Sequence, residues 1–318
     1  MTTTPAATVQ LPQLRGRRMV TDGGMETDLI FHYGIDLPCF AAFPLVDSAA
    51  GRSILARYYH GYAEIARRAG AGLLLESATW RASPDWGDRL GYSAAGLDRL
   101  NQLSITTLAG LRQEYAAGIA DIVISGMIGP RGDGYQPGSE ADPDAAAEYH
   151  APQARALAQA GADVISAYTL TDTGEAIGIV RAARAAGAPV AISFTLETNG
   201  RLPGGQALAE AISAVDAAAR PDYFLVNCAH PRHVGPAVAD AGDWRERIAG
   251  LRYNASVRSH AELDAATELD EGDITGLAAE HRQLARDLPA LTILGGCCGT
   301  DARHVAALWN QSSAAGPG

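Results

Sequence analysis

The sequence contains no lysine, so all 25 strongly basic residues are arginines. A chain without lysine cannot form the lysine Schiff base that activates carbonyl substrates or holds pyridoxal phosphate. The missing residue type therefore excludes both carbonyl-type and pyridoxal-type Schiff-base catalysis.

Cysteine and long apolar runs are also scarce. Only four cysteines occur in 318 residues, and two of them are adjacent, which does not fit a secreted disulfide framework. No apolar run reaches the length of a bilayer span, and residues 1–13 lack the apolar centre of a signal peptide. We therefore expect a cytoplasmic protein whose thiols stay reduced and free to bind metal.

The chain carries no excess of positive charge. Its formal net charge is −11, which argues against nucleic acid or an anionic membrane as the partner. Hydrophobic residues make up 47% of the chain, as in an ordinary globular protein. We expect a single domain spanning residues 1–318, with flexible ends at residues 1–13 and 312–318, and the sequence leaves the oligomeric state open.

Short apolar runs alternate with alanine-rich stretches of helical period along the whole chain. We expect strands at residues 18–21, 72–75, 121–125, 163–166, 189–193, 223–226, 248–252 and 291–294. We expect helices between them at residues 53–69, 97–117, 145–160, 174–186 and 208–218. Eight strand–helix units indicate parallel strands with right-handed crossovers, and most simply a (β/α)8 TIM barrel. A doubly wound open sheet is the competitor, but no Gly-x-Gly-x-x-Gly follows the first strand.

Unusual residues gather directly after the predicted strands, at the end of a barrel where active sites form. They are Asp22-Gly23-Gly24, Glu76, Tyr168, Glu197, Asn227-Cys228, Asn254 and Gly295 to Gly299.

Three of the four cysteines lie in this group, because Cys228 ends the sixth predicted strand and Cys297-Cys298 follow the eighth. Together they offer three thiolates to one zinc ion, which leaves the fourth position open as in catalytic zinc sites. Two other interpretations stay open: the cysteines are buried packing residues, or Gly295-Gly296 forms a phosphate-binding turn. Cys39 is predicted to be buried and inert.

A zinc ion held by three thiolates favours sulfur as its next ligand. It would keep an incoming thiol deprotonated near neutral pH, although a free thiol has a pKa of about 8.5. The thiolate would then attack an electrophilic carbon, such as an activated methyl group, so zinc would generate and align the nucleophile.

Three motifs resemble the homocysteine S-methyltransferase family. They are Asp22-Gly-Gly-Met25, Asn227-Cys228, and Gly295-Gly-Cys-Cys-Gly-Thr300 followed by His304. The resemblance covers residues 19–307 and implies a TIM barrel, a Zn²⁺ cofactor held by Cys228, Cys297 and Cys298, and methyl transfer to a thiol such as homocysteine. It also implies that Gly23 and Gly24 offer backbone N–H groups to the substrate carboxylate, while Asp22 orders the site.

Two positions depart from the family pattern. Tyr168 stands where the family commonly has a glutamate that meets the amino group of homocysteine, and a neutral tyrosine cannot pair with an ammonium group. Glu197 and Glu76 are candidate substitutes. Glu26 stands where the family has a small residue, and either contacts a cationic ligand or is simply an acid in the first turn of a helix.

The preferred hypothesis is a zinc-dependent S-methyltransferase that uses a small sulfonium or ammonium donor, such as S-methylmethionine, S-adenosylmethionine or a betaine. Aromatic side chains at the mouth either suit such a cation or simply pack against one another over the mouth. The alternatives are a different thiol acceptor, a zinc hydrolase or lyase, and a non-catalytic thiol-binding barrel. The predicted substrate-binding residues are Asp22, Gly23, Gly24, Met25, Glu26, Glu76, Trp80, Tyr168, Glu197, Asn227 and Asn254.

Overall fold

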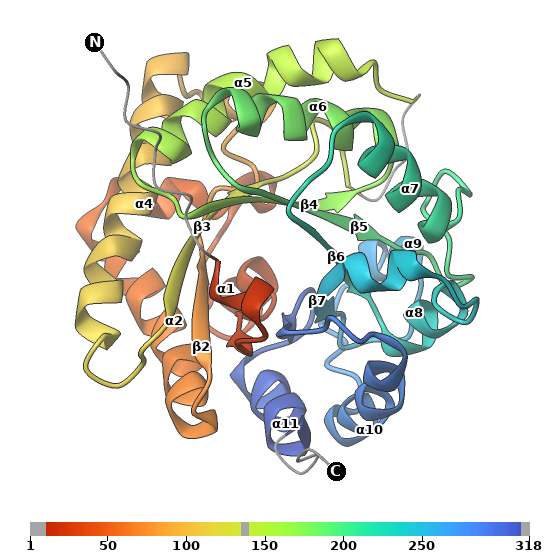
Figure 1. The fold of residues 1–318 in the computed structure, drawn as a ribbon. Helices are drawn as coiled ribbons and strands as arrows, with labels where there is room; N and C mark the ends of the chain where they lie inside the picture. The colour runs from red at the N-terminus through yellow and green to blue at the C-terminus, as the bar shows by residue number, and fades with distance from the viewer. Residues whose placement is uncertain (1–10, 135–139, 313–318) are drawn as a thin grey trace.

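Eight parallel strands form a closed barrel in which each strand pairs with its neighbours in sequence order (Figure 1). The computed structural model describes residues 11–134 and 140–312. The strands are β1 Met19–Val20, β2 Gly72–Glu76, β3 Ile122–Ile128, β4 Val164–Leu170, β5 Val190–Thr195, β6 Tyr223–Ala229, β7 Ile248–Tyr253 and β8 Ile293–Gly296. The predicted (β/α)8 TIM barrel is confirmed, and each of the eight predicted strands overlaps an observed one.

Helices surround the barrel in Figure 1. They are α1 Met25–Phe31, α2 Ala49–Ala69, α3 Pro84–Arg89, α4 Ala94–Tyr115, α5 Pro143–Gln159, α6 Thr173–Ala185, α7 Leu208–Ala218, α8 Pro231–Ala237, α9 His260–Asp264, α10 Ile274–Leu284 and α11 Ala302–Ser312. Short 3₁₀ turns lie at Pro12–Arg15, Pro38–Phe40, Phe43–Asp47, Asp243–Arg247 and Ala285–Asp287. The first long helix starts four residues before its predicted position because the Ser48 side chain accepts a hydrogen bond from Gly51 N–H and caps it.

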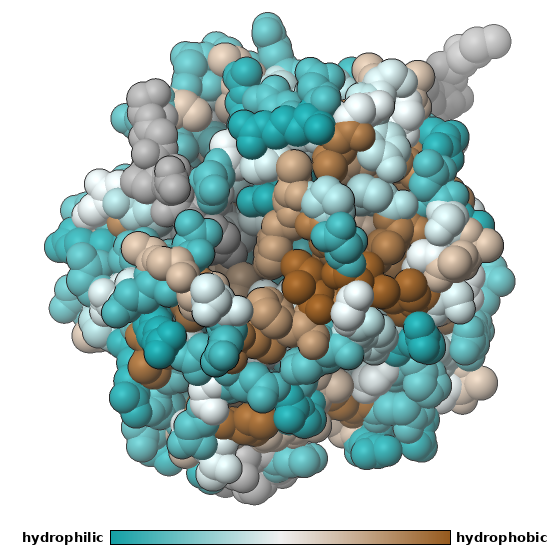
Figure 2. All heavy atoms as spheres, turned by 180° about the vertical axis from the view of Figure 1, so that it is seen from behind, coloured by the Kyte–Doolittle hydropathy of each residue, from teal (hydrophilic) through white to brown (hydrophobic). Residues whose placement is uncertain are grey.

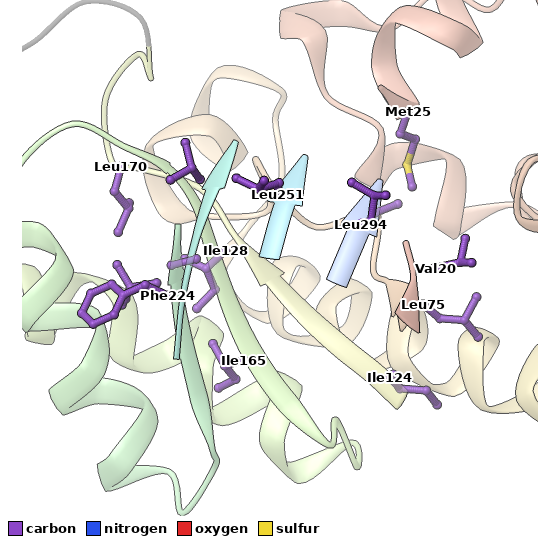
Figure 3. Close-up of a cluster of buried hydrophobic side chains, with 14 of the residues drawn as sticks. Val20, Met25, Leu75, Ile124, Ile128, Ile165, Leu170, Phe224, Leu251 and Leu294 are labelled. Carbon is purple, nitrogen blue, oxygen red and sulfur yellow. The ribbon is translucent and has the colours of Figure 1, made fainter. Parts of the chain in front are cut away.

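Alternating residues of the strands build two apolar layers. Along β6, Leu225 belongs to the cluster inside the barrel, whereas Phe224 and Val226 belong to the cluster between barrel and helices. Figure 3 shows part of the outer cluster, where Val20 and Leu75 project from neighbouring strands. Burial of these layers fixes which face of each strand points inward.

The chain segment before β1 closes the N-terminal end of the barrel. Leu11 is 4% exposed and belongs to the interior cluster, and Gln13 Nε2 donates a hydrogen bond to Tyr223 Oη at 3.2 Å. The prediction of a flexible segment over residues 1–13 is therefore wrong for residues 11–13, because they cover apolar side chains. At the other end α11 extends to Ser312, and the rest of both predicted flexible ends lies outside the described residues.

The seam of the barrel is short. β1 contains only two residues, and these pair with Gly72–Leu73 of β2 on one side and with Ile293–Leu294 of β8 on the other.

The face shown in Figure 2 has a hollow near its centre with an apolar area beside it. Within the described residues, no helix has the length and apolar character needed to cross a membrane.

Candidate active site

The three predicted cysteines meet at the C-terminal ends of β6 and β8. Their Sγ atoms all lie within 4.8 Å of one another, and the Sγ atoms of Cys228 and Cys298 are 3.7 Å apart. Cys228 is buried, while Cys297 and Cys298 are partly exposed toward the mouth. The prediction that Cys39 is buried is wrong, because its side chain is exposed and lies in a short 3₁₀ turn.

The backbone of Cys228 has an unusual conformation. Its φ angle is 51°, a left-handed value that costs a non-glycine residue roughly 1–2 kcal/mol. The register between β6 and β7 shifts between Asn227 and Ala229, which marks a β-bulge at this position. Bulges of this kind redirect a side chain next to an active site, and here the redirected side chain is a thiol of the cluster.

The side chain of Asn227 is buried and hydrogen-bonds to other residues of the site. Its Oδ1 accepts hydrogen bonds from Thr169 N–H at 2.9 Å and from Ser193 Oγ at 2.7 Å. Its Nδ2 donates to Thr169 Oγ1 at 2.8 Å and lies 3.7 Å from Cys297 Sγ. Thr169 also has a left-handed φ of 64°, so this one amide stabilises a strained neighbour and contacts the thiol cluster.

Hydrogen bonds to sulfur favour the thiolate form of Cys297, whereas hydrogen bonds to Cys228 and Cys297 raise the pKa of the Cys298 thiol. Contacts from Cys228 and Cys298 lower the pKa of Cys297, and Arg252 and Asn227 act in the same direction. The site is therefore suited to a cation that binds thiolate.

The glycine turn after β1 approaches the turn after β8 very closely. Gly24 N–H donates to the carbonyl oxygen of Thr300 at 3.0 Å. A Cβ atom on Gly24 would collide with the carbonyl oxygen of Cys297, and one on Gly23 would lie 2.8 Å from that of Thr300. Glycine is required here because two backbones pass each other without room for a side chain.

A buried arginine that the sequence did not single out connects this turn to the barrel. Arg252 is 5% exposed, and its Nη2 lies 2.5 Å from Asp22 Oδ1 and 3.1 Å from the carbonyl oxygen of Gly23. Its Nε donates to the carbonyl oxygen of Gly296 at 2.9 Å. Burial alone would lower the pKa of Arg252, but Asp22 and its other acidic neighbours raise it, so the guanidinium stays charged.

Tyr168 and Glu76 form a second buried contact beside that arginine. Tyr168 Oη donates to Glu76 Oε1 at 2.6 Å, and the Arg252 guanidinium lies 4.8 Å from the centre of the Tyr168 ring. Burial raises the pKa of Glu76 to about 7, although Arg252 opposes the shift. Tyr168 lines the cavity beside the thiols, whereas Glu76 is fully buried and does not line it.

The cavity beside the thiols is small, with a volume of about 50 Å³. Met25, Glu26 and Trp80 contribute to its wall together with the glycine turn and the three cysteines. Burial raises the pKa of Glu26 to about 7, and the negative neighbours Cys297 and Asp22 act in the same direction. Within residues 11–134 and 140–312, the Glu26 carboxylate has no side-chain partner in a hydrogen bond or ion pair.

A larger hollow of about 410 Å³ adjoins the small cavity, and the two share Thr27, Phe40 and Cys298. Asn254 lines the larger hollow. Glu197 lines neither cavity, because its carboxylate turns toward His260 Nδ1 at 3.1 Å. Eight of the eleven predicted substrate-binding residues therefore line the small cavity, and the exceptions are Glu76, Glu197 and Asn254 with the roles just described.

Comparison with known proteins gives a consistent picture. The sequence model of one family, described as homocysteine S-methyltransferase, matches residues 19–311. A protein described as homocysteine S-methyltransferase YbgG of Bacillus subtilis (strain 168) is 25% identical over 244 residues, which cover 70% of this chain and 76% of the relative.

Two crystal structures of the homocysteine methyltransferase MmuM from Escherichia coli share the fold. The oxidised form superposes with a TM-score of 0.73 at 21% identity and covers 92% of this chain and 96% of its own. The metallated form superposes with a TM-score of 0.72 at 22% identity and covers 94% of this chain and 99% of its own.

Proposed function

The chain belongs to the homocysteine S-methyltransferase family and is an enzyme of that class, and from this premise we propose that it moves a methyl group from a small sulfonium or ammonium donor to a zinc-bound thiol. Homocysteine, which would give methionine, is the expected acceptor. We place the reaction in the cytoplasm, where reducing conditions keep the three thiols available.

The arrangement of the three thiols carries the proposal. Four tetrahedral ligands at a zinc–sulfur distance of about 2.3 Å stand roughly 3.8 Å apart, and the Sγ atoms of Cys228 and Cys298 are 3.7 Å apart. The donor set fits zinc in chemistry as well, since thiolate and a free fourth position suit a thiol substrate. We therefore propose Cys228, Cys297 and Cys298 as the zinc ligands.

The residues of this chain would position two substrates and keep water away. Zinc, when bound, supplies a stable acceptor thiolate near neutral pH. Arg252 and Asp22 hold the Gly23–Gly24 turn at the wall of the small cavity, but the Gly24 N–H group already donates to the Thr300 carbonyl oxygen and is not available to the acceptor carboxylate. Trp80 and Tyr168 enclose the same cavity, and alignment within such an enclosed space accelerates a displacement between two molecules.

We assign recognition of the acceptor's ammonium group to Glu26. Tyr168 is committed to Glu76 by its hydroxyl group, whereas Glu26 lines the small cavity with a carboxylate that has no side-chain hydrogen bond or ion pair within the described ranges. An ammonium group beside Glu26 would also favour the charged form of this carboxylate. Glu26 would thereby take over the task of the family's missing glutamate.

The larger hollow suits the methyl donor. Its wall contains the acids Asp133, Asp264, Glu268 and Asp270 together with one arginine, Arg81, beside apolar residues. A negative wall attracts a cation, and Cys298 lies on the boundary with the small cavity. Donor and acceptor would therefore meet at the thiol cluster from two adjoining spaces.

The first experiment is elemental analysis of protein purified under reducing conditions and supplied with zinc, followed by methyl transfer with a panel of thiols and donors. We expect one zinc per chain and methylation of homocysteine with a sulfonium or ammonium donor. Absence of bound zinc would overturn the proposed cofactor. Turnover of another thiol with none of homocysteine would instead favour the alternative acceptor that Tyr168 suggests.

A further inference from the structure

A histidine and a glutamate lie directly behind the strained cysteine. We propose that His260, held by Glu197, is a positioning residue that fixes the Cys228 peptide and thereby aims the Cys228 thiol at the other two cysteines. The inference rests on the proposed function only in taking the thiol cluster as the metal site.

The bulge at Cys228 creates the need for such a residue. Because the β6–β7 register shifts between Asn227 and Ala229, the Cys228 carbonyl group departs from regular strand pairing. A buried carbonyl oxygen requires a donor from elsewhere. His260 Nε2 contacts it at 2.6 Å, and Thr195 Oγ1 donates to it at 3.3 Å.

The hydrogen-bonding roles of the His260 ring follow from its partners. The Cys228 carbonyl oxygen can only accept, so Nε2 carries a hydrogen. Nδ1 lies 3.1 Å from the Glu197 carboxylate. The carboxylate then fixes the orientation of the ring, as acidic partners do for histidines around metal sites.

The surroundings hold the ring in place. His260 is 6% exposed and is the first residue of α9. Ser259 caps that helix, since its Oγ accepts from Glu262 N–H and the Glu262 side chain accepts from Ser259 N–H. Glu197 comes from the loop after β5, so three segments far apart in the sequence converge on one peptide group.

The arrangement resembles the way in which Asn227 supports Thr169. Both Cys228 and Thr169 have left-handed φ angles, and each is held by polar contacts from another segment. Strain of this kind persists only where the surrounding structure enforces it. Loss of His260 should therefore release Cys228 toward an ordinary strand conformation and displace its thiol.

Cobalt(II) binding to the full-length apoprotein tests the proposal, because thiolate-to-cobalt absorption reports both affinity and ligand geometry. We expect His260→Ala to weaken cobalt(II) binding about 10- to 100-fold and to alter the absorption bands, a size typical for a residue behind a metal ligand. His260→Gln retains a donor and should restore most of the affinity. Glu197→Gln should have a smaller effect than His260→Ala.

His233 provides the matched control. Its Nε2 also contacts a backbone carbonyl oxygen, that of Val257, at 3.0 Å, but Val257 is not a ligand of the cluster. His233→Ala should therefore leave the cobalt spectrum and affinity unchanged, with folding of every variant checked by circular dichroism. Wild-type affinity and spectrum in His260→Ala would overturn the proposal.

A second measurement separates this inference from the proposed function. In metal-free protein, the alkylation rate of Cys228 by iodoacetamide, followed by mass spectrometry, reports the placement of its thiol directly. We expect a changed rate in His260→Ala and near-wild-type behaviour in His260→Gln. If wild-type protein bound no metal, the proposed function would fail while this rate still decided whether His260 positions Cys228; an unchanged rate would refute that role.

Discussion

The two ends of the barrel interior differ in what holds them together. At the N-terminal end, apolar side chains such as Leu225 and Ile293 fill the barrel and Leu11 covers them. At the C-terminal end, buried charges and strained peptides replace that packing, with Arg252, Asp22 and the left-handed Cys228 close together. The comparison shows one end that stabilises the fold and another that uses part of this stability to hold reactive groups.

The largest expected effect is a loss of metal binding and activity at the C-terminal end of the barrel, with the stability of the apolar core unchanged. Cys298→Ser should abolish zinc binding and methyl transfer, because the metal would lose one of its three thiolate ligands. The melting temperature of the metal-free protein should change little. Zinc analysis and a methyl-transfer assay measure the outcome, with the exposed Cys39→Ser as control; full activity in Cys298→Ser would remove that residue from the ligand set.

The opposite result is expected for a substitution in the apolar core, which should lower stability and leave the metal site intact. Leu225 is fully buried inside the barrel, and Leu225→Ala should lower the free energy of unfolding by about 2–5 kcal/mol. Zinc content of the folded protein should remain that of the wild type. The control is Leu14→Ala, since Leu14 is 47% exposed, and denaturant unfolding distinguishes the two variants; equal stabilities would contradict the assigned packing.

A pH experiment sharpens the comparison, because Glu76 is a buried acid at the C-terminal end of β2 and its pKa is raised toward neutrality. The pKa of Glu76 is raised from 4.5 to about 7 in the folded state, so the folded protein binds an extra proton between these pH values. Stability contributed by protonated Glu76 is present below pH 4.5 and is lost as the pH rises to 7. Relative to Glu76→Gln, the wild type should lose roughly 3 kcal/mol of unfolding free energy across this range.

Unfolding curves at several pH values measure this difference. The exposed Glu148 of α5 offers a control, and Glu148→Gln should follow the pH dependence of the wild type. Parallel pH profiles for wild type and Glu76→Gln would show that Glu76 does not titrate in this range.

The smallest effect concerns specificity within the mouth. Glu26→Gln should raise KM for homocysteine about 10- to 100-fold, as expected for loss of a charge-assisted hydrogen bond. A thiol of similar length with a carboxylate but no amino group should show no such change. Steady-state kinetics with both thiols measure the difference, and an equal rise in KM for both would remove Glu26 from ammonium recognition.

The sequence predicted the barrel and the cysteine cluster because both depend on local patterns. Strand–helix alternation recurs along the chain, and Asn227-Cys228 and Cys297-Cys298 each end an apolar run. The importance of Arg252 was not predicted, since its partners Asp22 and Gly296 come from other strands and meet it only after the barrel closes.

Side-chain direction was a further limit of sequence analysis. Glu197 was correctly placed after the fifth strand, but a turn in which Gly200 N–H bonds to the Glu197 carbonyl oxygen at 2.9 Å shapes its loop. The carboxylate consequently meets His260, 63 residues away in the sequence. Contacts over such separations depend on how loops cross the mouth, which strand and helix patterns do not encode.

The two-residue first strand has a consequence for the order in which activity appears during synthesis. The glycine turn follows β1, whereas two of the three thiols follow β8, and Gly24 N–H bonds to Thr300 across the seam between them. A ribosome must therefore translate the chain beyond β8 before the site can assemble. Methyl-transfer activity should therefore appear only after the last strand has been synthesised and the barrel has closed.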